Sequence, residues 1–143
     1  MHGAMAAAYN IDPDWGLAVD TINAEDSDVF ETKGVHMGKG PVIIVMDAEI
    51  ITSQVVNDWI QKVARRKKIP VQVRVEEEGT SDATSILLSK GGHPATMLAV
   101  PVRNLHSTVG IAHMKDVRWM IRLVRELLVS PPAFLSSTGS VNR

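Results

Sequence analysis

The chain has 143 residues, of which 45% are apolar and 22% charged, and its net charge is -1. A chain of this size fits one domain that buries roughly two-thirds of its unfolded surface. The balanced charge argues against a nucleic-acid footprint and against a disordered chain. The absence of cysteine excludes disulfides and thiolate metal ligands, so any metal would need His, Asp or Glu.

The N-terminal segment has no pattern typical of targeting or membrane insertion. Residues 1–8 are small and apolar, but they lack the basic leader and the long apolar run of a signal peptide. No stretch of the chain reaches membrane-spanning length. We therefore expect a cytoplasmic protein with no membrane partner. The residues after Pro132 show no sustained periodicity, which predicts a flexible tail over 131–143.

Four strands are predicted from short apolar or alternating runs. The run GLAVDTI, residues 16–22, is β-prone and bounded by loop-like sequence, which predicts a buried strand. The almost continuously apolar run 41–46 predicts an interior strand that is covered on both faces. Residues 71–75 alternate as a strand does, and ATMLAVPV, residues 95–102, gives the fourth strand.

Helices are predicted between these strands. Apolar residues recur at helical spacing over 53–67, and a second helix over 81–90 begins at an N-cap, Thr80 or Ser81. In the last helix, 114–129, the expected apolar face is Val117, Ile121, Val124 and Leu128. The expected order is helix, strand, strand, helix, strand, helix, strand, helix. This order predicts an α/β sheet with helices on both faces, in one domain without repeats.

Asp20 is an anomaly because it interrupts an apolar strand. A carboxylate buried without a partner costs several kcal/mol or is forced to take up a proton. Two explanations stay open: backbone N–H groups or an arginine at the strand end could hold the charge, or the carboxylate could bind a metal.

His106 is a second anomaly, because it follows the strand in VPVRNLHSTVG. A histidine in such a place is most often a surface or hydrogen-bonded residue. A metal-bound imidazole usually needs a partner for its second ring nitrogen, and Ser107 or Thr108 could supply one. Because residues at strand ends of α/β sheets are where ligands usually bind, both interpretations stay open.

Three successive carboxylates, Glu76 to Glu78, invite a hypothesis of acid–base chemistry. Successive residues at a strand end point to opposite faces, so Glu76 and Glu78 cannot share a site with Glu77. We therefore favour a solvated acidic strand end.

The next residues, Gly79, Thr80, Ser81 and Asp82, precede a predicted helix. Such a turn exposes backbone N–H groups that can hold a carboxylate or carbonyl oxygen. Helix capping alone also explains the three polar residues.

The glycine-containing stretch HMGKGP, residues 36–41, lacks phosphate-loop spacing and precedes a strand, so we expect no nucleotide there. The other histidines are interpreted as surface or turn residues: His2, His36, His93 and His113.

Taken in order, five segments resemble one family. They are GAMAAAYNIDPDWGLAVDT, MGKGPVI, IPVQV, GTSDATSILLSKGGHPATMLAVPVRNLHS and the closing helix. The set is similar to the glutamyl aminopeptidase, or TET aminopeptidase, family, which is metallopeptidase family forty-two. Its members have often been labelled endo-1,4-β-glucanases. The resemblance runs from about residue 3 to about residue 128.

The resemblance implies a fold, a cofactor and site residues. It implies the mixed α/β sheet of a di-metal aminopeptidase catalytic domain, here its C-terminal portion over 1–130, with two zinc or cobalt ions and peptide substrates. Asp20 would bind one metal and His106 the other. The family's Gly-Gly-Thr-Asp-Ala loop, which contacts substrate, corresponds here to Gly79-Thr80-Ser81-Asp82-Ala83 and differs at two positions. Family members often form dodecamers, so a homo-oligomer is expected.

The resemblance also implies what this chain does not carry. Family chains are more than twice as long, and they have an upstream metal-binding histidine, a bridging aspartate and a Glu-Glu pair that supplies a metal ligand and the general base. We therefore expect no catalytic residue in this chain and no activity from it alone, unless it pairs with a separate N-terminal half. The alternative is a non-catalytic binding or oligomer-assembly module derived from the same fold.

Overall fold

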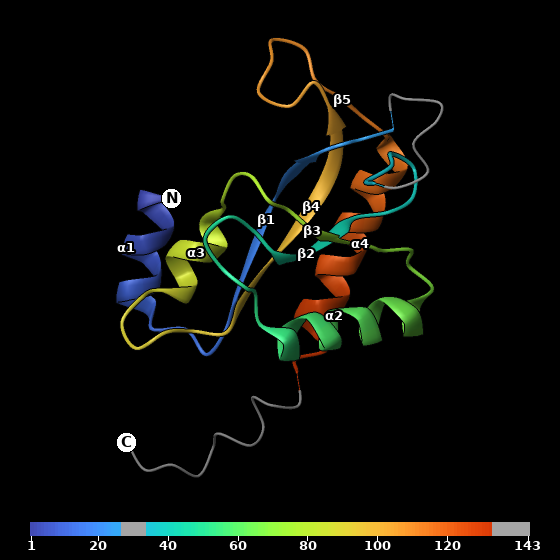
Figure 1. The fold of residues 1–143 in the computed structure, drawn as a ribbon. Coiled ribbons are helices and arrows are strands. Elements are labelled where there is room, and N and C mark those ends of the chain that lie inside the picture. The colour runs from blue at the N-terminus through green and yellow to red at the C-terminus, as the bar shows by residue number, and fades with distance from the viewer. Residues whose placement is uncertain (27–33, 133–143) are drawn as a thin grey trace.

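The computed structural model describes residues 1–26 and 34–132 (Figure 1). From residue 133 onward, the predicted flexible tail lies outside the described residues. Within the described ranges, no helix is both long and apolar enough to cross a membrane. The elements in chain order are α1 (His2–Ile11), β1 (Gly16–Asn23), β2 (Val42–Met46), α2 (Gln54–Lys67), β3 (Gln72–Val75), α3 (Asp82–Leu87), β4 (Ala95–Arg103), β5 (Ile111–Ala112) and α4 (Met114–Val129).

The strands form one mixed sheet in the order β1-β4-β2-β3, and the two-residue strand β5 pairs with β4. β1 runs parallel to β4 and β3 runs parallel to β2, whereas β2 and β4 are antiparallel. The four predicted strands are confirmed; β5 was not predicted. The prediction that the first strand is buried is wrong. Among the residues that the structure describes, β1 lies at the sheet edge with one neighbour, and Val19 within it is 54% exposed.

Helices cover both faces of the sheet, as predicted. Because side chains alternate along a strand, Ile43 and Leu98 point to one face, where α2 and α4 pack. Ile44 and Met97 point to the opposite face, which we call the cavity face. There α3 packs against β1 and β4, and α1 packs on α3 (Figure 1).

The helix α4 packs through a different stripe from the one predicted. Its buried residues are Asp116, Met120, Leu123 and Leu127. Ile121 and Leu128, which were expected to face the core, are 64% and 71% exposed. The error arises because apolar residues occupy a wide arc of this helix, so two adjacent stripes fit helical spacing equally well. Packing against β4 and α2 decides between them.

The loop over 36–41 binds a carboxylate of the protein itself. Asp116 is fully buried, and its two oxygens accept the N–H groups of Gly38 (2.5 Å) and Gly40 (2.8 Å). These backbone donors hold α4 against the segment that leads into β2. His113 also has a structural role, because its Nδ1 accepts the Lys115 N–H (3.1 Å) and caps α4.

Candidate active-site cavity

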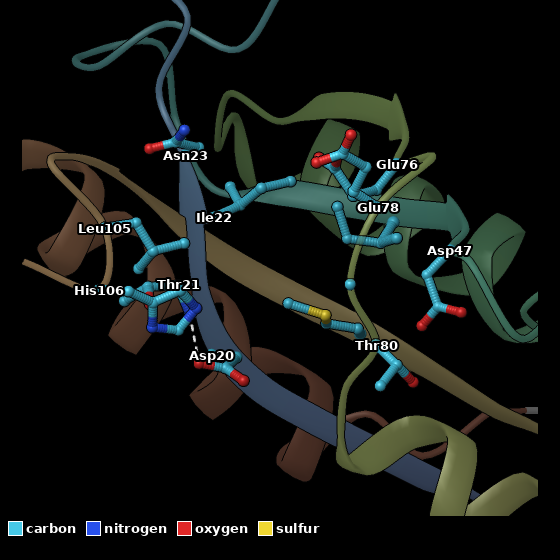
Figure 2. Close-up of a pocket in the computed structure, with 13 residues that line it drawn as sticks. Asp20, Thr21, Ile22, Asn23, Asp47, Glu76, Glu78, Thr80, Leu105 and His106 are labelled. Atoms are coloured by element: carbon cyan, nitrogen blue, oxygen red, sulfur yellow. Dashed lines mark hydrogen bonds between the residues drawn. The ribbon is translucent and has the colours of Figure 1, made fainter.

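A cavity of about 370 Å³ opens on the cavity face of the sheet (Figure 2). Segments distant in sequence form its walls: the end of β1, β2 and the turn after it, the stretch between β3 and α3, and the loop after β4. Its polar side chains include Asp20, Asn23, Asp47, Glu76, Glu78, Thr80 and His106. Its apolar side chains are Ile22, Ile44, Met97 and Leu105.

Asp20 lies on β1 and lines this cavity. Strand alternation places it on the same face as Ala18 and Ile22, which are both buried. The expectation that Asp20 itself is buried is wrong, because β1 is an edge strand and the carboxylate is exposed. One of its oxygens accepts the Thr21 N–H at 2.7 Å. The carboxylate therefore keeps solvent around its charge, and no large desolvation cost has to be offset.

His106 lies in the loop after β4 and lines the same cavity. Its φ is 60° and that of Asn104 is 57°, so two residues of this turn are left-handed. Ser107 and Thr108 were considered as partners for the second ring nitrogen, and neither bonds the imidazole in the part of the chain that the structure describes. The Ser107 hydroxyl instead donates to the Asn104 carbonyl (2.6 Å) and accepts the Val109 N–H (3.3 Å), which holds the turn itself. The backbone of this loop is therefore held in place, and with it the position from which the His106 side chain extends.

The structure brings Asp20 and His106 into one cavity although they are far apart in sequence. β1 and β4 are parallel neighbours, so their carboxyl ends meet at the same edge of the sheet. Figure 2 shows both side chains on the same side of the cavity. Over residues 1–26 and 34–132, no group of three or more metal-ligating side chains gathers closely enough to hold an ion. Metal binding by this pair stays a prediction.

The four residues from Gly79 to Asp82 do not all face the cavity. Gly79 and Thr80 line it. Ser81 is 3% exposed, and its hydroxyl accepts an N–H of the first turn of α3 at 3.2 Å, so Ser81 is the N-cap. Asp82 pairs with the amino group of Met1 at 3.0 Å. Contact with substrate stays a prediction for this segment, and its first two residues are the best placed for it.

Three carboxylates that line the cavity were not predicted as site residues. Glu76 and Glu78 line it and Glu77 does not, which confirms the alternation but contradicts a purely solvated strand end. Asp47 follows β2 and is only 6% exposed. Its Oδ1 accepts two backbone N–H groups of the following turn, both at 2.9 Å. The signal that could have identified these carboxylates is that they follow β2 and β3, which are parallel neighbours and therefore end at one edge of the sheet.

Solved structures define the class of this fold, which is the catalytic-domain fold of TET-type aminopeptidases. The chain is similar to an aminopeptidase of Desulfurococcus kamchatkensis (TM-score 0.87, 30% identity, 96% of this chain and 40% of that one). It is also similar to a TET aminopeptidase of a marine-sediment Thaumarchaeota archaeon (TM-score 0.84, 32% identity, 91% and 37%). A third similar structure is the TET1 peptidase of Pyrococcus horikoshii (TM-score 0.73, 28% identity, 88% and 36%).

The family follows from the sequence match. Residues 1–123 match the family model of the M42 glutamyl aminopeptidases. The chain therefore belongs to this metallopeptidase family, which confirms the resemblance seen in its motifs. It aligns with 36% to 39% of the length of the curated relatives it matches, so it corresponds to part of their catalytic domain.

Proposed function

We propose that this chain is the portion of a di-metal aminopeptidase that supplies one ligand to each of two zinc or cobalt ions, Asp20 and His106. The supporting observation is that Asp20 lines the cavity from β1 and His106 lines it from the loop after β4, the parallel neighbour of β1. A carboxylate oxygen and an imidazole nitrogen are ordinary zinc ligands. When bound, such ions polarise a carbonyl and lower the pKa of a bound water.

In this proposal the chain also positions the peptide. The Thr21 N–H fixes one Asp20 oxygen, which leaves the other oxygen for an ion. Gly79 and Thr80, at the cavity wall, are the residues that we expect to touch the peptide. Ser81 acts on the same segment indirectly, because it caps α3 and thereby holds the wall in place.

Calorimetric titration with zinc tests the proposed ligands. We expect weak binding by the chain, because each ion ordinarily has at least three protein ligands and this cavity offers one apiece. Asp20→Ala combined with His106→Ala should abolish the heat of binding. The matched control is Asp58→Ala combined with His2→Ala, which removes the same two residue types from exposed positions outside the cavity. Equal zinc binding by the two double variants would contradict the proposal.

We expect the purified chain alone to hydrolyse no aminoacyl p-nitroanilide when zinc or cobalt is added. The physical reason is that two ligands do not hold the water that attacks the carbonyl, and an aminopeptidase also needs a general base near that water. The assay is release of p-nitroaniline at saturating metal. Turnover that Asp20→Ala or His106→Ala removes would show that the chain carries a complete catalytic set.

A second candidate function is a non-catalytic binding or assembly module. The observation that favours it is that the described ranges, 1–26 and 34–132, bring no three metal ligands together. If this candidate is correct, the heat of zinc binding is unaffected by the changes at Asp20 and His106. The same titration therefore distinguishes the two candidate functions.

We further propose that the chain associates, either with copies of itself or with a chain that supplies the rest of the domain. β1 is an edge strand, and an unpaired edge tends to be covered by another strand or chain. The TET1 peptidase of Pyrococcus horikoshii can assemble into a tetrahedron or a large octahedral shell. A cytoplasmic location stays part of this proposal, in keeping with a cysteine-free sequence.

A further inference from the structure

We infer that the side of the cavity opposite His106 binds a cationic side chain, so that the preferred peptides begin with lysine or arginine. The inference rests on the proposed function. It assigns a role in substrate selection to Asp47 and Glu78, which are not among the proposed metal ligands. Figure 2 shows these carboxylates, with Glu76, on one side of the cavity and the Asp20–His106 pair on the other. A peptide whose first carbonyl lies at the pair would extend its first side chain across the cavity.

The surface between the two sides suits the stem of such a side chain. Ile22, Ile44 and Met97 line the cavity from β1, β2 and β4, and together they give it an apolar floor. Lysine and arginine lay an apolar stem along such surface while the charged head stays among polar groups. A short or fully polar side chain would leave this floor in contact with water.

Asp47 gives the far side of the cavity a carboxylate in a fixed position. Only 6% of Asp47 is exposed, yet the residue lines the cavity. Its hydrogen bonds to the parts of the chain that the structure describes all use Oδ1, from the N–H groups of Glu49 and Ile50. These bonds fix the carboxylate and leave Oδ2 as an acceptor. A buried carboxylate held in this way is stabilised further when a cation approaches it.

The cavity holds an excess of negative charge with no lysine or arginine in its lining. Arg74 pairs with Glu25, and its Nε lies 3.9 Å from a Glu76 oxygen. Glu76 is therefore partly neutralised, and Asp47 and Glu78 carry most of the uncompensated charge on the side opposite His106. Like charges repel, so a peptide with an acidic first residue would be disfavoured at the same place.

The test is an NMR titration of the 143-residue chain with amino-acid amides in the presence of EDTA, which removes metal. Lysinamide is compared with norleucinamide, which has an apolar stem without the cation, and with glutamic acid amide. We expect lysinamide to bind about fivefold more tightly than norleucinamide, with the shifts confined to the cavity lining, since a partly exposed ion pair contributes up to about 1 kcal/mol.

Glu78→Gln and Glu77→Gln form a matched pair, because both remove one charge from adjacent exposed residues and only Glu78 lines the cavity. We expect Glu78→Gln to bring the affinity for lysinamide close to that for norleucinamide, and Glu77→Gln to leave the ratio unchanged. Equal affinity for the two amides in the unchanged protein, or equal effects of the two variants, would overturn the inference. If lysinamide selectivity persists but zinc binding does not depend on Asp20 and His106, the metal proposal fails and the charge selectivity stands.

Discussion

Gly40→Ala is expected to lower the free energy of unfolding by more than about 4 kcal/mol, which would leave little folded protein. A Cβ on Gly40 would lie 2.1 Å from the carbonyl oxygen of Pro70 and 2.7 Å from its carbonyl carbon. These atoms belong to backbone, so no side-chain rotation relieves the contact. The φ of Gly40 is +103°, a conformation that side chains of L residues rarely adopt.

The matched control for this change is Gly79→Ala. Gly79 also has a positive φ, +82°, but a Cβ built there has no heavy atom within 4 Å. This control therefore isolates the backbone strain, which we expect to cost about 1–2 kcal/mol. Urea denaturation followed by circular dichroism measures both, and soluble yield reports on Gly40→Ala if it does not fold. A loss no larger than that of Gly79→Ala would show that the loop moves away from Pro70 at little cost.

The strand and helix positions were largely predictable because the relevant patterns are local. The apolar run of β2 and the helical spacing in α2 each lie within one segment, and each element forms where its pattern predicts. Burial was harder to predict. β1 has an apolar sequence like that of β2, but its burial depends on how many neighbours it has in the sheet, which a single segment does not contain.

The sequence predicted the two metal-ligand candidates but did not predict the acidic side of the cavity. Asp20 was identified by its odd position within an apolar strand, His106 by its position just after one, and both by resemblance to a family; the structure places them in one cavity. Asp47 had no such signal. Its place in the cavity depends on β2 lying between β4 and β3, a pairing order that local periodicity does not contain.

The same limit applies to Asp116, whose partners lie 76 and 78 residues away in sequence. Helical spacing predicted an apolar face for α4, and a carboxylate next to that face gave no reason to expect burial. Only the juxtaposition of α4 with the loop over 36–41 shows that the acid completes a set of backbone donors. A buried acid of this kind can be recognised from structure and then tested by substitution.

Asp116→Asn is expected to lower the free energy of unfolding by about 3 kcal/mol. Asp116 is fully buried, and each of its oxygens accepts one backbone N–H, from Gly38 and from Gly40. Asparagine keeps the shape but has one oxygen, so its NH₂ group would face an N–H donor. The change therefore loses a charge-assisted hydrogen bond and leaves a buried donor unsatisfied, each of which costs about 1–3 kcal/mol. It also removes a negative charge from the first turn of α4, worth about 0.3–1 kcal/mol.

Urea denaturation gives the free energy, and hydrogen exchange at the amides of Gly38 and Gly40 gives the local effect. We expect both amides to lose protection in Asp116→Asn while amides in the core of the sheet keep theirs at low denaturant. The matched control is Asp58→Asn, the same change at an exposed position of α2, which should alter stability by less than about 0.5 kcal/mol. A loss below about 1 kcal/mol for Asp116→Asn would mean that water or a shifted loop satisfies these donors. The carboxylate would then not be what joins α4 to the segment before β2.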